Sequence, residues 1–154
     1  MFTNSRYHHS VTRLQSVIPR HASGSAVTHD YMKPQEDRAV FLERTRRLCE
    51  QLHVDADAFQ IVHVAGTSGK GSTSTMIYNM LRKYKKKVGI FRSPFVTTSI
   101  ENIEVDGLLI APDAFADLVD RIIPIAEQIA TTTPKQTPSY SELFFAIAMQ
   151  YFTD

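Results

Sequence analysis

Residues 66–72 read Gly66-Thr67-Ser68-Gly69-Lys70-Gly71-Ser72, a glycine-rich stretch that carries one lysine. The stretch follows an apolar run at residues 60–65, which predicts a buried strand, and precedes a helical pattern at residues 71–84. A strand, a glycine-rich turn and a helix together form a phosphate cradle, because the backbone can approach the phosphates and the helix N-terminus supplies positive potential. The sequence therefore predicts binding of ATP or a close relative. The predicted nucleotide-binding residues are Thr67, Ser68, Gly69, Lys70, Gly71 and Ser72, with Lys70 as a mobile charge on the outer phosphates.

The loop departs from the commonest phosphate-loop motif at the position after the lysine. A hydroxyl that reaches Mg²⁺ is usual there, whereas this chain has Gly71. Ser72 follows one place later, rotated by about 100° on a helix of 3.6 residues per turn. We therefore expect the ion to take an oxygen from another part of the chain. The alternative interpretation is an ordinary turn made of glycines and serines.

A second strand is predicted at residues 88–92, parallel to the first because a helix connects the two. This arrangement indicates an α/β fold, a doubly wound parallel sheet of the phosphate-loop type with flanking helices. In such sheets ligands bind at the carboxyl ends of the strands. Ser93, which ends the second strand, should then lie near the phosphate loop if the two strands are neighbours. The alternative is that Ser93-Pro94 simply makes a turn.

Hydrophobic periodicity predicts further helices at residues 35–52 and 112–129. Pro112 suits the first position of its helix, and Pro124 should kink it. Residues 139–142 form an S-x-x-E capping box before another helical pattern. In the helix after the phosphate loop, four apolar residues should face the sheet: Met76, Ile77, Met80 and Leu81.

Residues 1–34 form a separate N-terminal segment, and its first 29 residues contain no acidic side chain. An acid-free segment with arginines and serines is typical of an organellar transit peptide. Alternatively, residues 7–18 form a short helix with four apolar residues on one face: Val11, Leu14, Val17 and Ile18. The helix is the favoured interpretation. We expect a cytoplasmic location, with a mitochondrial location as the alternative.

Composition excludes several classes of function. A net charge of +1 argues against a general nucleic-acid binder. No apolar run approaches the roughly 18 residues that would suggest a membrane span. The single cysteine, Cys49, cannot form an internal disulfide and fits a small core residue.

Three motifs carry a resemblance to a known family. Residues 63–72 read HVAGTSGKGS and resemble the HVAGTNGKGS signature of the folylpolyglutamate synthase and dihydrofolate synthase family, with Ser68 in place of Asn. Residues 88–95 read VGIFRSPF and resemble the family's VGLYTSPH strand. Residues 139–142 read SYSE, where the family has T-x-F-E. The match extends from about residue 38 to residue 152.

The resemblance implies the N-terminal part of a Mur-ligase-type central ATPase domain over residues 35–154. It implies ATP and Mg²⁺ as cofactors, Ser93 as the Mg²⁺ ligand, and transfer of L-glutamate to a folate or dihydropteroate through an acyl phosphate. It also implies a monomer in the full-length protein. A helix segment and the SYSE segment match substrate-contacting motifs. The residues implied for the substrate are Leu42, Arg44, Ser139, Tyr140, Ser141 and Glu142, for which a charged helix face and a capping box are the structural alternatives.

The family's enzymes are several hundred residues long, so the 154 residues are interpreted as a fragment or a truncated product without the C-terminal ligase domain. We expect this chain alone not to catalyse ligation. The alternatives are a non-catalytic ATP-binding module and a different small phosphate-loop kinase, the latter disfavoured by Gly71 and by the motif at Ser93.

Overall fold

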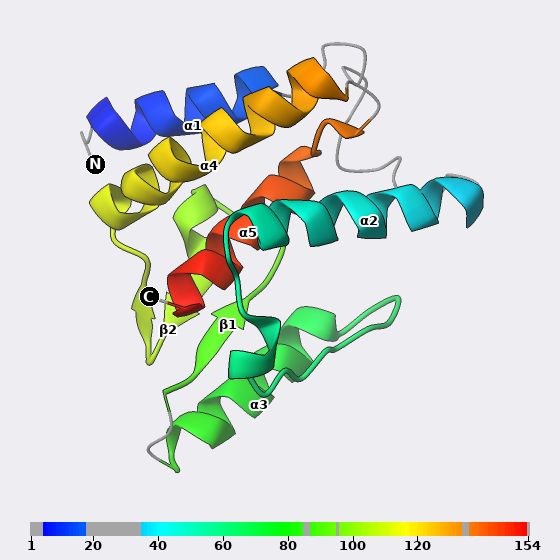
Figure 1. Ribbon diagram of the computed structural model, residues 1–154. Coiled ribbons are helices and arrows are strands. Elements are labelled where there is room, and N and C mark those ends of the chain that lie inside the picture. The colour runs from blue at the N-terminus through cyan, green and yellow to red at the C-terminus, as the bar shows by residue number, and fades with distance from the viewer. Residues whose placement is uncertain (1–4, 18–34, 85–86, 95, 134–135, 154) are drawn as a thin grey trace.

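The computed structural model describes residues 5–17, 35–84, 87–94, 96–133 and 136–153, and this part of the chain is mainly helical (Figure 1). Its longer helices are α1 (Ser5–Val17), α2 (Gln35–Gln51), α3 (Lys70–Arg82), α4 (Pro112–Thr132) and α5 (Tyr140–Thr153). Figure 1 shows α1 lying along α4, with α5 between this pair and the small sheet, and α3 on the far side of the sheet. Among the described residues, no helix combines the length and apolarity needed to cross a membrane.

The hydrophobic core lies where α1, α4 and α5 pack together. The residues with fully buried side chains include Leu14, Phe115, Ile122, Ile123 and Ile147. The Phe115 ring lies 5.5 Å from the rings of both Tyr7 and Phe144, which joins the three helices through aromatic contacts. These positions follow helical periodicity, so the apolar stripe of each helix faces the others.

The N-terminal helix predicted at residues 7–18 is confirmed over Ser5–Val17, while residue 18 lies outside the described part of the chain. Burial of Leu14 fixes its apolar face. At its exposed edge Arg6 forms ion pairs with Asp117 and Asp120 of α4, and Arg13 also pairs with Asp120. Such exposed pairs add little stability, so burial of the apolar stripe is the main reason that α1 packs on α4.

The helices predicted at residues 35–52 and 112–129 are also present. Helix α4 begins at Pro112 and continues past Pro124 to Thr132. The predicted capping box precedes α5. The Ser139 backbone N–H donates to a Glu142 carboxylate oxygen at 2.6 Å, and the Glu142 N–H donates to Ser139 Oγ at 3.4 Å.

The sheet differs from the prediction. Strands β1 (Gly89–Phe91), β2 (Ile103–Val105) and β3 (Leu108–Leu109) form an antiparallel sheet in the order β1-β2-β3, with Phe91 opposite Ile103. The second predicted strand is therefore present as β1, but its partner is β2. The described part of the chain contains no parallel sheet.

The strand predicted at residues 60–65 does not form. Ile61 and Val62 are 63% and 61% exposed, and this segment has no extended ladder in the structure. Strand geometry depends on a hydrogen-bonded neighbour, and none of the strands in the described residues pairs with this segment. The apolar run at residues 60–65 predicted buried side chains, but Ile61 and Val62 are exposed in the structure.

Helix α3 also presents a different face to the sheet. Met76, Met80 and Leu81 are exposed and Ile77 is only partly buried, so the predicted sheet-facing stripe is wrong. The buried residue of α3 is instead Tyr78. Its hydroxyl accepts a hydrogen bond of 2.7 Å from the Gly107 backbone N–H, in the turn between β2 and β3. The helix thus meets the hairpin through a tyrosine and leaves its thioether side chains on the opposite face.

Candidate nucleotide site

The glycine-rich loop has the backbone geometry that opens a helix toward an anion. Gly69 is the N-cap of α3 and adopts φ +75°, a left-handed conformation that glycine adopts without steric cost. Its carbonyl accepts from the Thr73 N–H at 2.9 Å, which starts the helical hydrogen-bond ladder. The amides before Thr73 in the first turn have no intrahelical acceptor and point their positive ends away from the helix.

Space above the loop is open. A side-chain carbon placed at Gly69 or Gly71 would meet nothing within 4 Å. Residues 66–73 are all exposed. A phosphate can therefore approach the backbone directly, as the glycine content of the loop predicts.

Lys70, the first residue of α3, folds back across the loop. Its ammonium donates to the Gly66 carbonyl oxygen at 2.5 Å. An ammonium has three donors, so this bond leaves two for a ligand. The lysine is held over the loop, where it can add charge to the helix N-terminus.

Ser93 follows β1 by two residues, and its neighbour Arg92 contacts α3. The Arg92 guanidinium reaches the hydroxyl of Thr75, in the second turn of α3, at 3.5 Å. Ser93 itself is exposed. The parallel sheet that was expected to bring Ser93 near the loop is absent from the described residues, where β1 pairs with β2 in an antiparallel sheet.

Binding of Mg²⁺ at this site would require oxygen ligands from the protein and from the nucleotide. The described residues contain no group of three or more His, Cys, Asp or Glu side chains that could hold a metal. The exposed Ser93 hydroxyl is a hard oxygen donor, and Mg²⁺ commonly combines few protein oxygens with substrate phosphates and water. Ser93 therefore fits an ion that is bound mainly by a nucleotide.

Two of the predicted substrate residues form a buried ion pair. Arg44 of α2 donates to both carboxylate oxygens of Glu142 at 3.1 and 2.9 Å, and the side chains are only 12% and 8% exposed. Thr45 Oγ1 adds a contact of 3.4 Å to Glu142. Two parallel hydrogen bonds of this kind fix the guanidinium and carboxylate planes relative to each other. The pair therefore joins α2 to the start of α5. Glu142 serves the capping box and the ion pair together.

The other predicted substrate residues are more scattered. Leu42 and Ser141 are exposed, whereas Ser139 is used in the capping box. The Tyr140 ring packs against the Phe144 ring, with 5.0 Å between the ring centroids. Burial raises the pKa of Tyr140 to about 12, so the phenol is neutral at physiological pH.

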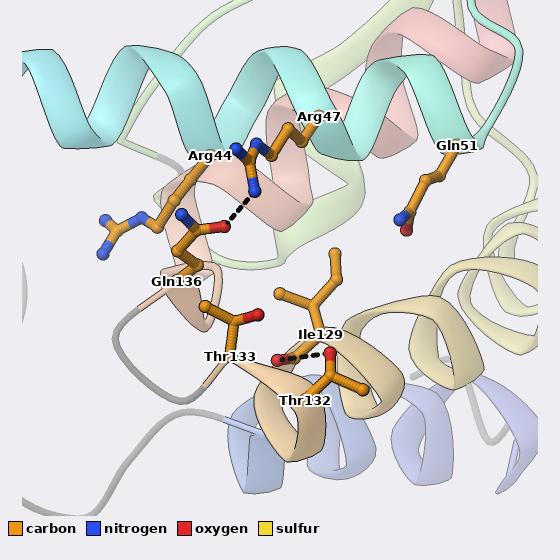
Figure 2. Close-up of a pocket in the computed structure, with 7 residues that line it drawn as sticks. All are labelled: Arg44, Arg47, Gln51, Ile129, Thr132, Thr133 and Gln136. Atoms are coloured by element: carbon orange, nitrogen blue, oxygen red, sulfur yellow. Dashed lines mark hydrogen bonds between the residues drawn. The ribbon is translucent and has the colours of Figure 1, made fainter.

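A shallow hollow of about 80 Å³ lies between α2 and the end of α4 (Figure 2). Its lining residues are Arg44, Arg47, Gln51, Ile129, Thr132, Thr133 and Gln136. Figure 2 shows Arg47 and Gln136 closing one side through a hydrogen bond of 2.7 Å. Arg44 is the only predicted site residue in this lining, and its guanidinium points away toward Glu142. The hollow is thus separate from the phosphate loop.

Cys49 shows no sign of nucleophilic activation. The thiol is free and partly buried. Burial, with a smaller contribution from the charge of Glu50, raises the pKa of Cys49. Reactive cysteines have a lowered pKa, so this residue fits the structural role that the sequence predicts.

Sequence reasoning missed a polar network between α3 and the sheet. Arg92 donates to Glu104 of β2 at 2.7 Å and contacts Thr75 of α3, and the Tyr78 hydroxyl accepts from the Gly107 N–H. The only signal was the i, i+3 spacing of Thr75 and Tyr78, which places two hydroxyls on one helix face. A pattern search for apolar stripes passes over such a face.

No family model matches the chain, but comparison with individual proteins is informative. The dihydrofolate synthase/folylpolyglutamate synthase of Bacillus subtilis is 35% identical over 113 residues, which cover 73% of this chain and 26% of that protein. The mitochondrial folylpolyglutamate synthase of Homo sapiens is 33% identical over 98 residues, covering 64% and 17% respectively.

Solved structures agree with these relatives. Folylpolyglutamate synthase of Mycobacterium tuberculosis, complexed with ADP and AMPPCP, matches with a TM-score of 0.70 and 25% identity, over 78% of this chain and 28% of that chain. A complex of FPGS with AMPPCP and folate shares the fold, with a TM-score of 0.72 and 23% identity, over 96% and 32%. These relatives are named as synthases of folylpolyglutamate or dihydrofolate, and the chain spans about a sixth to a third of their length. The chain belongs to the folylpolyglutamate synthase/dihydrofolate synthase family.

Proposed function

We propose that residues 35–154 are part of the ATP-binding domain of a ligase that joins L-glutamate to a folate or dihydropteroate. The observation that carries the proposal is the loop itself. Gly69 opens α3 in a left-handed conformation, and Lys70 lies over the loop with donors to spare. Relatives that are named for folylpolyglutamate synthesis, one of them complexed with ADP and AMPPCP, support the assignment.

In the proposed reaction a carboxylate oxygen of the folate attacks the γ-phosphorus of ATP, and ADP departs. The glutamate amine then attacks the acyl carbon, loses a proton, and displaces inorganic phosphate. The pteroyl substrate supplies the nucleophile in the first step, which agrees with the unactivated state of Cys49. Mg²⁺, when bound, would neutralise charge on the phosphates, with Ser93 as its protein oxygen.

The residues of this chain would contribute to the reaction by stabilising negative charge. Backbone amides of residues 69–72 and the Lys70 ammonium would stabilise negative charge that develops on the transferred phosphoryl group. The Arg44–Glu142 pair would form the wall on the pteroyl side, where Arg44 offers hydrogen-bond donors once Glu142 is partly released. Leu42, Ser139, Tyr140 and Ser141 are the remaining candidates for that wall.

Titration of MgATP into the 154-residue chain tests the loop. Removing a charged hydrogen-bond donor costs about 1.5–3 kcal/mol, so Lys70→Ala should weaken affinity about 10–100-fold. Lys83→Ala is the matched control, because Lys83 lies at the opposite end of the same helix. Equal affinity of the Lys70→Ala variant and the unmodified chain would refute the role of Lys70.

Phosphate release separates ligation from simple nucleotide binding. Positioning of two reactants contributes about 7–11 kcal/mol to barrier reduction. Glutamate has no assigned site among the described residues, so we expect the 154 residues to bind ATP without turnover. Phosphate release that requires both a folate and glutamate would overturn this expectation and place the glutamate site within this chain.

A further inference from the structure

Helix α3 is tied to the sheet by two sets of polar contacts. Their members are Thr75, Tyr78, Arg92, Glu104 and Gly107. Arg92 donates to Glu104 at 2.7 Å and contacts Thr75 Oγ1 at 3.5 Å, and the Tyr78 hydroxyl accepts from the Gly107 N–H at 2.7 Å. These contacts therefore join two turns of α3 to β1, β2 and the β2–β3 turn.

Arg92 is held from two sides. Its backbone N–H donates to the Asn102 carbonyl at 3.0 Å, and its side chain forms the partly buried pair with Glu104. The exposed fractions of these two side chains are 30% and 14%, so the pair is shielded from solvent more than an ordinary surface pair. The conformation of Arg92 is thereby fixed relative to both the sheet and α3.

The far end of α3 is anchored to the same hairpin. Arg82 donates to the Asp106 carbonyl at 2.8 Å and lies over the Tyr78 ring. The Asp106 carboxylate accepts from the Val88 N–H at 2.9 Å, just before β1. With its middle and its C-terminal end attached, the helix cannot slide along the sheet without breaking several of these contacts.

We propose that Arg92 and Glu104 are positioning residues, which set the distance between Ser93 and the phosphate loop. Ser93 is the next residue after Arg92, and Thr75 is five residues beyond Lys70, or about 7.5 Å along the helix. The guanidinium therefore links the residue beside the proposed metal ligand to the helix that carries the proposed phosphate ligands. This inference rests on the proposed function for the roles of Ser93 and Lys70.

If the Arg92–Glu104 pair were merely structural, it would stabilise the fold without any effect on Mg²⁺ binding. A positioning pair acts on the metal-dependent part of nucleotide affinity, because partners that orient a ligand typically change metal affinity about 10–100-fold. The ratio of ATP affinity with Mg²⁺ to ATP affinity in EDTA isolates that part. Thermal unfolding of each variant measures the structural contribution separately.

The first experiment measures this ratio by calorimetry in the 154-residue chain. We expect Arg92→Gln and Glu104→Gln to lower it about tenfold, and to leave the affinity in EDTA within about twofold because the loop is untouched. Arg92→Lys should restore part of the ratio. Arg46→Gln is the matched control, since Arg46 pairs with Glu43 and Glu50 on an exposed face of α2. An unchanged ratio in both Arg92→Gln and Glu104→Gln would overturn the proposal.

A second experiment needs no nucleotide, so its failure is distinct from failure of the proposed function. Spin labels at Ser72→Cys and Ser93→Cys, in a Cys49→Ala background, report the distance between α3 and the end of β1. We expect a single narrow distance distribution that broadens with Arg92→Gln and keeps its width with Arg46→Gln. If Arg92→Gln leaves the distribution unchanged, Arg92 does not position Ser93, whether or not ATP binds. Broadening without any ATP binding would retain the positioning role and reject the nucleotide site.

Discussion

The helical layer of α1, α4 and α5 and the region around α3 contrast in how their apolar side chains are used. In the helical layer the apolar stripes of three helices meet, and side chains such as Ile123 have no exposed surface. Around α3, Ile61, Met76 and Met80 lie on the surface, and the helix is held by hydroxyls and charges. The helical layer is stabilised by burial of apolar side chains, whereas the region around α3 leaves the glycine-rich loop exposed to solvent.

The same substitution in both regions should show the largest contrast. Ile123→Ala removes buried methyl groups and leaves a cavity, at a cost of about 2–5 kcal/mol in unfolding free energy. Ile61→Ala, at a side chain that is 63% exposed, should change it by less than about 0.5 kcal/mol. Urea unfolding measures both. Equal losses would mean that Ile61 is covered in solution, and the two regions would no longer differ.

The ion pair between α2 and α5 should come next in size. Arg44→Ala leaves the buried Glu142 carboxylate without its main partner, with an expected loss of about 1.5–3 kcal/mol. Arg46→Ala, on the exposed side of the same helix, should have little measurable effect because its pairs are solvated. Chemical unfolding of the two variants measures both changes in unfolding free energy. A loss that is the same for both would show that Glu142 is solvated too.

Within the region around α3, two glycines should respond differently to substitution by alanine. Gly107 has φ +92°, and a side-chain carbon there would collide with the Arg82 guanidinium, so Gly107→Ala should cost about 1–3 kcal/mol. Gly71 lies in the first turn of α3 with open space around it, so Gly71→Ala should be neutral or stabilise by about 0.5–1 kcal/mol. Thermal unfolding of both variants is the measurement. Destabilisation by Gly71→Ala would show that the loop is more crowded than this structure indicates.

The smallest expected effect is a dependence on alkaline pH in the helical layer. Burial raises the pKa of Tyr140 to about 12, above the value of about 10 for an unfolded chain. The folded state thus keeps this proton longer, so the contribution is fully present below pH 10 and is lost as the pH rises toward 12. Tyr140→Phe should flatten that part of the stability profile. Identical profiles for the variant and the unmodified chain would contradict the assigned burial.

The contrast also explains which features the sequence could predict. Periodic apolar residues gave the helices at α1, α2, α4 and α5, and Ser139 with Glu142 gave the capping box, because these are local patterns. The predicted strand at residues 60–65 required a partner that a local pattern cannot supply. The buried face of α3 was mispredicted because Tyr78 and Thr75 bond to Gly107 and Arg92, which are distant in sequence.

The candidate site also contains features that local sequence patterns predict and features that depend on the tertiary fold. Local patterns predicted the loop, including the turn at Gly69 and the position of Lys70 at the start of α3. Arg44 and Glu142 were predicted separately through the family resemblance, and their mutual ion pair is a property of the tertiary fold. Arg92 and Glu104 carried no local signal, because each is an ordinary charged residue beside a short strand.

The most direct test of the central claim is a crystal structure of the 154-residue chain with AMPPCP and Mg²⁺. We predict phosphate oxygens on the backbone amides of residues 69–72, the Lys70 ammonium on the outer phosphates, and Ser93 Oγ at about 2.0–2.1 Å from the ion. Nucleotide bound in the hollow between α2 and α4, or an ion held by Ser72 with the Ser93 hydroxyl turned away, would contradict it.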